Sequence, residues 1–204
     1  ILLSYCLVDN KHTLSRPIIL LEENKPHQKG NWIDTIFKIT DIQYATRLIS
    51  IKSNNLDENS IDIYINGTLI KPNKTSSVDP QLTYKFSRGG FYNIKFNIKK
   101  SLTTMEWLFA NNHDIVSVTF LPGFDSSQVT SMENMFVSSN IQSLDMRNLC
   151  TDKLQNLRSF ININNYRYNY KTPKIRNNPI IDISSFDTSN VKNCAGMLHE
   201  LHDD

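Results

Sequence analysis

The chain has 204 residues with 22 basic and 20 acidic side chains, which gives a formal net charge of +2 at pH 7. That length suits one compact domain or two small ones, and 39% hydrophobic with 21% charged residues is typical of an ordered globular chain. The nearly neutral balance argues against nucleic acid or anionic lipid as the partner, and the sequence contains no run of about 18 apolar residues that would predict a membrane span.

The first part of the chain alternates apolar and polar residues with a period of two from Trp32 onward. Thr35–Thr40 and Arg47–Lys52 are rich in β-branched and aromatic residues, which predicts two strands. Ile61–Ile65 places its isoleucines on one face of a third strand. Asn66-Gly67 follows at once and is the dipeptide best suited to a type I′ hairpin turn.

The alternation is clearest in Tyr92–Ile98, which follows a turn at Gly89-Gly90 and a further strand at Leu82–Phe86. We therefore predict a half-buried antiparallel sheet of five or six strands, arranged as a small β-sandwich-like domain over residues 32–99. Residues 1–31 precede it as an N-terminal segment in which Ile18–Leu21 could add a strand.

Residues 100–204 contain an internal repeat. Four segments, beginning at Leu102, Val129, Leu154 and Val191, place apolar residues at i, i+3, i+6 and i+7, so their starts step by 27, 25 and 37. This spacing is typical of one stripe of a two-turn helix. The long last step contains an insertion near residues 162–178.

Short apolar runs between these segments predict strands at Ile115–Phe120, Ile141–Met146 and Ile180–Ile183. Each unit is thus expected to consist of a strand, a turn and a short helix, stacked on its neighbours because none can bury its apolar edge alone. Asp125–Ser127 and Asp187–Asn190 directly precede two of the predicted helices, where their side-chain oxygens would cap the helix N termini.

The repeat resembles the surface-protein repeat of roughly 26 residues found in BspA-like leucine-rich proteins. Phe124–Phe136 and Phe186–Asn193 contain its Phe-Asp and hydroxyl positions and its apolar positions in register, and Leu144–Leu149 matches its strand portion. Two positions depart from the family pattern: Leu149–Asp152 stands where Phe-Asp-Thr-Ser is expected, and Cys194 takes a usual methionine position.

This resemblance implies an α+β fold, with the N-terminal antiparallel β-sandwich-like domain followed by a short leucine-rich-repeat-like solenoid of strands and helices over residues 100–204. Members of the family are typically exported and serve in adhesion or protein binding. The resemblance therefore implies a non-enzymatic extracellular or cell-surface module.

The insertion holds the candidate partner-binding residues: Tyr166, Arg167, Tyr168, Tyr170, Lys171 and Arg176. Tyrosine and arginine are favoured anchors of interfaces, so we predict a protein or glycan contact there. Aromatic residues interleaved with cations also stack nucleobases, but the near-neutral chain disfavours nucleic acid. A solvated loop without any partner is the alternative.

No catalytic, metal or cofactor site is predicted. His199–Asp204 lacks the i, i+4 histidine pair of zinc peptidases, and His113-Asp114 is interpreted as part of an exposed loop. The three cysteines are too few and too scattered for a zinc site or a disulfide framework: Cys6, Cys150 and Cys194.

Two sequons, beginning at Asn66 and Asn73, are candidate glycosylation sites if the chain enters a secretory compartment. The predicted function is adhesion or binding. The alternative is a structural subunit that self-assembles into a filament or larger complex through an open solenoid end, because the last predicted helix, Val191–Leu198, has no strand or polar cap after it.

Overall fold

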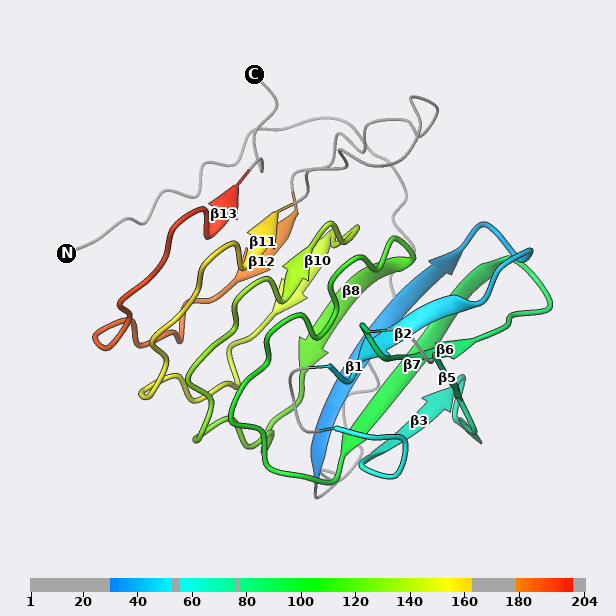
Figure 1. The fold of residues 1–204 in the computed structure, drawn as a ribbon, viewed down its shortest axis with the longest axis horizontal. Helices are drawn as coiled ribbons and strands as arrows, with labels where there is room; N and C mark the ends of the chain where they lie inside the picture. Colours follow the sequence, from blue (N-terminus) through cyan, green and yellow to red (C-terminus); the bar gives the residue numbers. More distant parts are fainter. Residues whose placement is uncertain (1–29, 53–55, 76–77, 163–178, 200–204) are drawn as a thin grey trace, which may run out of the picture.

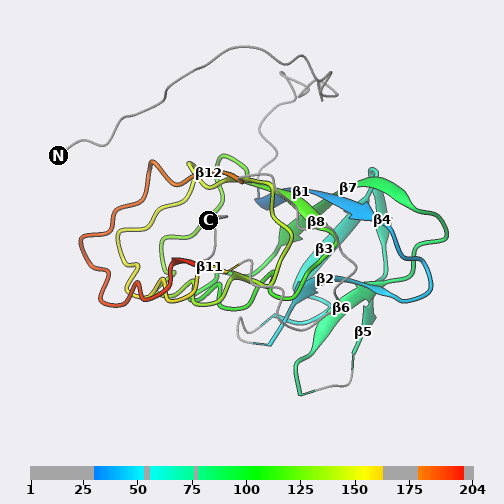
Figure 2. The ribbon, with the colours of Figure 1, turned by 90° about the horizontal axis from the view of Figure 1, so that it is seen from above.

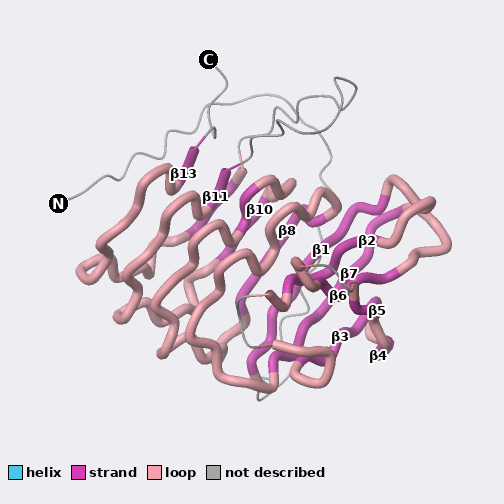
Figure 3. The backbone as a smooth tube through the Cα atoms, viewed as in Figure 1, coloured by secondary structure: helices cyan, strands magenta, loops and turns pink. Residues whose placement is uncertain are grey.

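The computed structural model describes residues 30–52, 56–75, 78–162 and 179–199. Within these ranges the regular structure consists of thirteen β-strands and no helix (Figure 3). The predicted α+β class is therefore wrong, and so is the leucine-rich-repeat-like solenoid of strands and helices, because the segments expected to be helical form turns and short strands.

The first seven strands are β1 (Asn31–Ile39), β2 (Thr46–Ser50), β3 (Ile61–Ile65), β4 (Thr68–Ile70), β5 (Asn73–Lys74), β6 (Gln81–Tyr84) and β7 (Gly90–Ile98). The last six are β8 (Ile115–Phe120), β9 (Phe136–Val137), β10 (Ser143–Asp145), β11 (Ile161–Asn162), β12 (Ile180–Asp182) and β13 (Leu198–His199). The predicted strands of the first part correspond to β1, β2, β3, β6 and β7. In β1, β3 and β7, alternating residues point into the core and away from it.

One sheet of seven strands runs through the molecule in the order β12-β10-β8-β1-β7-β3-β4 (Figure 1). Strand β8 pairs antiparallel with β1 and parallel with β10, which pairs parallel with β12. The antiparallel strands of the N-terminal half and the repeats of the C-terminal half therefore share a single sheet. Two smaller sheets, β2-β6-β5 and β13-β11-β9, lie on the opposite side of the core (Figure 2).

The hairpin predicted at Asn66-Gly67 is confirmed. Asn66 has φ 48° and Gly67 has φ 82°, the two positive values that a type I′ turn requires. This turn sets the register of β3 and β4, in which Ile65 faces Thr68 and Ile63 faces Ile70. Strand β4 then forms one edge of the seven-stranded sheet.

The four repeat segments (102–109, 129–136, 154–161 and 191–198) lie side by side, joined by parallel bridges through Thr104, Ser131, Asn156 and Asn193. Each segment has one residue in the left-handed region near its middle: Trp107 (φ 60°), Asn134 (φ 55°), Ser159 (φ 47°) and Gly196 (φ 62°). One such residue prevents a continuous right-handed helix. The repeats consequently form a stack of helix-free coils.

The backbone hydrogen bonds confirm why these segments are not helical. The N–H of Trp107 donates to the carbonyl of Glu133 at 3.1 Å, and the N–H of Asn134 donates to the carbonyl of Arg158 at 3.0 Å. Both bonds join neighbouring coils, whereas a helix would bond each N–H to a carbonyl four residues earlier in its own segment. Asp125 and Asp187 likewise do not cap helices, since each carboxylate closes a turn by accepting the N–H two residues later.

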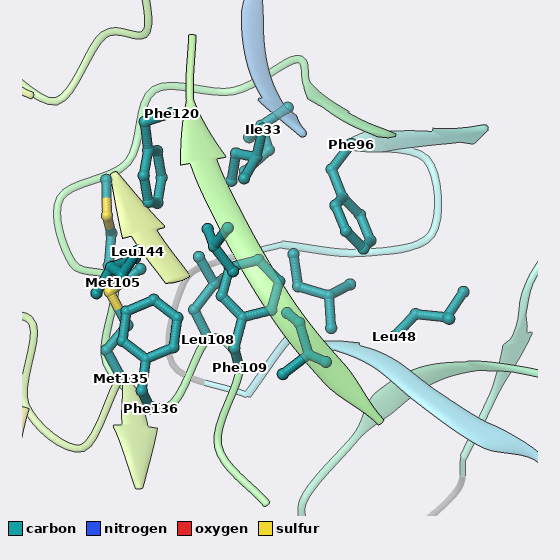
Figure 4. Close-up of a cluster of buried hydrophobic side chains, with 14 of the residues drawn as sticks. Ile33, Leu48, Phe96, Met105, Leu108, Phe109, Phe120, Met135, Phe136 and Leu144 are labelled. Carbon is teal, nitrogen blue, oxygen red and sulfur yellow. The ribbon is translucent and has the colours of Figure 1, made fainter. Parts of the chain in front are cut away.

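The core runs unbroken from the antiparallel strands into the coils. A row of phenylalanine rings marks its length, with successive ring centroids 5.8, 5.7, 5.6 and 6.3 Å apart: Phe96, Phe109, Phe136, Phe160 and Phe186. Figure 4 shows Phe109 and Phe136 beside Met105, Met135 and Leu144, within the same apolar layer. Each coil therefore packs its apolar side chains against those of the next coil, as the repeat predicts.

Candidate interaction surface at the end of the coil stack

The candidate partner-binding residues Tyr166, Arg167, Tyr168, Tyr170, Lys171 and Arg176 lie outside the described residues. The chain enters that insertion from Asn162, in β11, and returns at Pro179, next to β12. The predicted contact through these six side chains therefore stays a prediction.

The two candidate glycosylation sites lie beside edge strands. Asn66 is exposed in the turn before β4, and Asn73 is exposed in β5, which is an edge of its own three-stranded sheet. The Asn66 Oδ1 accepts the N–H of Asn93 at 3.0 Å. The sequon hydroxyl of Thr75 accepts the N–H of Gln81 at 3.0 Å. Asn66 therefore lies next to the β4 edge, and Asn73 lies on the β5 edge.

The opposite end of the molecule is formed by β12 and β13, which are the outer strands of their two sheets (Figure 1). We call this surface the β12–β13 end. Its side chains occupy repeat positions that the earlier coils bury completely. At the last apolar position of the repeat, the exposed fractions are 1% for Phe109, 0% for Phe136, 0% for Ile161 and 44% for Leu198.

The other apolar positions follow the same trend. Met105, Met132 and Leu157 are 0% exposed, whereas their equivalent Cys194 is exposed. Leu108, Met135 and Phe160 are 0% exposed, whereas their equivalent Met197 is only partly buried. Ile181, in β12, is only partly buried, whereas its register equivalents Leu144 and Val118 are 1% and 0% exposed. The apolar column that holds the coils together therefore reaches the surface at the β12–β13 end.

Backbone hydrogen-bonding groups also reach the surface there. The N–H of Met132 donates to the carbonyl of Asn156 at 2.9 Å, and the N–H of Leu157 donates to the carbonyl of Asn193 at 2.7 Å. The equivalent N–H of Cys194 has no such acceptor among residues 30–52, 56–75, 78–162 and 179–199. The fourth segment thus presents the same donors as the others, and no described coil lies next to it on that side.

The two edge strands direct further groups outward. The N–H of Ile180 donates to the carbonyl of Gln142 at 3.0 Å, and the carbonyl of Asp182 accepts from Met146 at 3.0 Å, so both residues face β10. Successive residues of a strand face opposite neighbours, which directs the N–H and carbonyl of Ile181 to the open edge. The same reasoning applies to Leu198 in β13, since the preceding carbonyl, of Met197, accepts from Ile161 at 2.9 Å.

A column of hydroxyl groups repeats the pattern. The Ser126 hydroxyl is 1% exposed, accepts the N–H of Cys150 at 2.8 Å and donates to the carbonyl of that residue at 2.9 Å. In the next coil the Thr151 hydroxyl, 3% exposed, accepts the N–H of Asp187 at 2.7 Å. The third member, Thr188, is exposed and makes no side-chain hydrogen bond to a described residue.

Charge at this end is low. Residues 179–199 contain two aspartates, Asp182 and Asp187, and one lysine, Lys192, so their formal charge is 1 − 2 = −1. Arg147 donates to Asp145 at 2.8 Å and lies 3.2 Å from Asp182. The hydroxyl of Ser184 and the guanidinium of Arg147 lower the pKa of Asp182. The carboxylates therefore stay ionised but partly compensated.

Two polar regions lie outside the β12–β13 end. The loop at His113-Asp114 was predicted to be exposed, and a hollow beside β4 was not predicted. His113 is exposed, as expected for a loop histidine. Desolvation lowers its pKa and raises the pKa of the neighbouring Asp114 carboxyl, so both neutral forms are favoured. In the part of the chain that the structure describes, no cluster of three His, Cys, Asp or Glu residues is placed to hold a metal ion.

A hollow of about 420 Å³ lies between β3, β4 and β5. Its wall carries an ion pair between Lys74 and Glu58 at 3.0 Å. Close by, hydrogen bonds from Ser60 and Lys100 lower the pKa of Asp57 to about 2. These charged side chains are exposed and form ion pairs with one another. They therefore present no unsatisfied buried group to a ligand.

The sequence placed the main predicted contact on the insertion and did not point to Ile180 and Ile181, whereas the self-assembly alternative included Leu198 in the segment Val191–Leu198. No helix in the described part of the chain is long and apolar enough to cross a membrane. Comparison of the chain with protein-family models, curated proteins and solved structures finds no match.

Proposed function

We propose that this chain is a non-enzymatic, extracellular or surface-located binding module that contacts a protein partner through the β12–β13 end. The observation that carries the proposal is the exposure of repeat positions that are buried in every earlier coil. Leu198 is 44% exposed where its three equivalents are at most 1% exposed. A surface of this kind gains free energy when another apolar surface covers it.

The chemistry of this end favours a protein over a glycan. The open strand edges of β12 and β13 offer N–H and carbonyl groups in the spacing of a β-strand, which another polypeptide strand can pair. The neighbouring side chains are the aliphatic Ile180 and Leu198. A sugar would need polar side chains and flat aromatic faces, which the insertion residues Tyr166–Arg176 contain, so a glycan contact is assigned to that insertion as the subordinate proposal.

An extracellular location rests on the resemblance of the repeat to exported surface proteins and on the two exposed sequons. It is tested by expressing the chain behind a secretion signal in eukaryotic cells and treating the product with an N-glycosidase. Asn66→Gln and Asn73→Gln should each remove one step of the electrophoretic shift. A product that no glycosidase shifts would argue against the glycoprotein assignment.

The binding proposal is tested on protein and glycan arrays with matched variants. Leu198→Lys places a charge at the β12–β13 end, and Leu69→Lys places the same charge on β4, where Leu69 is 58% exposed at the opposite edge of the sheet. We expect Leu198→Lys to abolish protein capture and Leu69→Lys to leave it unchanged. Equal capture by both variants would contradict the proposal.

A third variant lacks residues 164–177 and addresses the insertion. Loss of glycan capture with retained protein capture would assign the glycan contact to Tyr166–Arg176. Unchanged capture on both arrays would remove the predicted role of the six insertion residues, while the assignment of the β12–β13 end would be unaffected.

A further inference from the structure

We infer that the partner at the β12–β13 end is a second copy of this chain, joined through a two-fold axis that sets β12 against β12 and β13 against β13 in antiparallel pairs. This inference rests on the proposed function and specifies its partner. It predicts a closed dimer.

The β12–β13 end continues three contacts already made inside the molecule. Segments one and two, two and three, and three and four pack through the same apolar positions and the same N–H to carbonyl bonds. The surface left on the fourth segment is therefore shaped for an apolar column with an open strand edge. Another β12–β13 end has both features.

The open edges of β12 and β13 are self-complementary. Ile181 and Leu198 each direct an N–H and a carbonyl outward. When two such strands meet antiparallel, a residue opposite its own copy exchanges two hydrogen bonds with it, with the Cα atoms about 5.5 Å apart. We place one two-fold axis through both residues, perpendicular to the two sheets, because β12 and β13 are the outer strands of their sheets at the same end of the stack (Figure 1).

The charges at the β12–β13 end do not oppose this pairing. With Ile181 opposite its own copy, antiparallel register places Asp182 of one chain opposite Ile180 of the other. The two Asp182 carboxylates are thereby kept from facing each other directly. Since residues 179–199 carry a formal charge of only −1, electrostatic repulsion between two such ends is small.

The covered face of the first coil favours a closed dimer over a filament. A filament would need a complementary open face on the first coil, and that face is occupied. Strand β8 pairs with β1 along Ile33–Phe37. The carbonyl of Leu108 accepts the N–H of Ser50 at 2.9 Å, and the Asn112 side chain donates to the carbonyl of Arg47 at 3.0 Å. Among the described residues, the coil stack is therefore open only at the β12–β13 end, and pairing through that end joins two copies.

The exposed β4 and β5 edges are less suited to pairing for two reasons. The exposed candidate glycosylation sites Asn66 and Asn73 lie on or beside these strands. Charged side chains also surround them, including the Lys74–Glu58 ion pair, and charge on an edge strand opposes strand pairing. Residues 179–199 contain no sequon, and their only charged side chains are Asp182, Asp187 and Lys192.

The decisive test is a cross-link placed on the axis. In a full-length background with Cys6, Cys150 and Cys194 replaced by serine, Leu198→Cys would bring two thiols together across the two-fold, at a Cα separation within the range of a disulfide. Copper phenanthroline serves as the oxidant. We expect a covalent dimer for Leu198→Cys and monomer for the matched variant Leu69→Cys on β4.

The second measurement is sedimentation equilibrium of the full chain. Wild type and Leu69→Lys should fit a monomer–dimer equilibrium, and Leu198→Lys should raise the dissociation constant at least about tenfold, with circular dichroism confirming that each variant is folded. A monomer at every concentration, equal cross-linking at both cysteines, or masses that grow beyond a dimer would overturn the inference.

The outcomes separate this inference from the proposed function. If the chain is monomeric but Leu198→Lys still abolishes capture on the protein array, the binding end is retained and the second copy is rejected. If Leu198→Lys changes neither self-association nor capture, both are rejected.

Discussion

Replacing Met135 by alanine should destabilise the protein far more than the same replacement at Met197, which is its equivalent two repeats later, at the end of the stack. Met135 is 0% exposed and lies between its repeat equivalents Leu108 and Phe160, which are also 0% exposed. Removing a fully buried methionine costs about 2–5 kcal/mol, since the lost transfer free energy is joined by the cost of a cavity that the surroundings cannot fill. We expect ~3 kcal/mol for Met135→Ala.

Met197 is only partly buried, so its removal opens a surface indentation that water can fill. The transfer free energy of a fully buried methionine is about 1.5–3 kcal/mol, and a partly buried one contributes a fraction of it, so we expect ~1 kcal/mol for Met197→Ala. Urea denaturation at a protein concentration that keeps the chain monomeric measures both free energies of unfolding. Thermal midpoints should fall by roughly 6–12 °C for Met135→Ala.

Equal losses of stability in Met135→Ala and Met197→Ala would contradict this prediction. If both variants lose the same free energy of unfolding, then either Met197 is covered in solution or the column at Met135 is not a continuous core, and the assignment of the β12–β13 end as open is wrong. Repeating the measurement at higher protein concentration separates these cases, because a dimer interface would make only the Met197→Ala cost depend on concentration.

Three further predictions test the local structure. Hydrogen bonds lower the pKa of Asp57 to about 2 in the folded chain, so its stabilising contribution is lost as pH falls from near 4 to 2; Asp57→Asn should show a smaller fall in melting temperature over that range. Ser159→Gly should stabilise by up to ~1 kcal/mol in urea titrations because φ is 47°, whereas Ser143→Gly in β10 should destabilise by ~0.5–1 kcal/mol. Ser126→Ala should cost ~1–2 kcal/mol by leaving a backbone N–H unpaired, while Thr188→Ala should stay within about 0.5 kcal/mol; equal losses would contradict the hydroxyl column.

The strands of the N-terminal half were predictable because their signals are local. Alternation in Tyr92–Ile98 and the Asn66-Gly67 turn fix one strand face and one register without any distant information. The pairing of β1 with β8 joins residues near 35 to residues near 117. Such a contact leaves no mark in either segment, so the sequence could not reveal that both halves share one sheet.

The helices were predicted wrongly although the apolar positions were identified correctly. Spacing at i, i+3, i+6 and i+7 places side chains on one side of a two-turn helix, and it does the same for a tight coil that reverses through a left-handed residue. Gly196 and Asn134 were the distinguishing signals, since glycine and asparagine adopt positive φ most readily. Trp107 and Ser159 gave no such signal.

The candidate site was predictable only in outline. The apolar pattern of the last repeat segment, Val191–Leu198, was visible in the sequence and supported the self-assembly alternative. Which atoms it presents depends on the direction of the backbone in Ile181 and Leu198, and that direction follows from hydrogen bonds that the sequence does not display.

The hydrogen bonds that join each coil to the next in series have a consequence for how the protein opens. Each repeat segment is tied only to its neighbours, and the first is anchored to the antiparallel strands through β1 and β8. Local unfolding should therefore begin at β13 and proceed inward one coil at a time, because the stack is anchored only at its β8 end. Amide exchange should be slowest beside β8 and quicken toward Leu198, and a protease would shorten the chain from that side before it cut the middle.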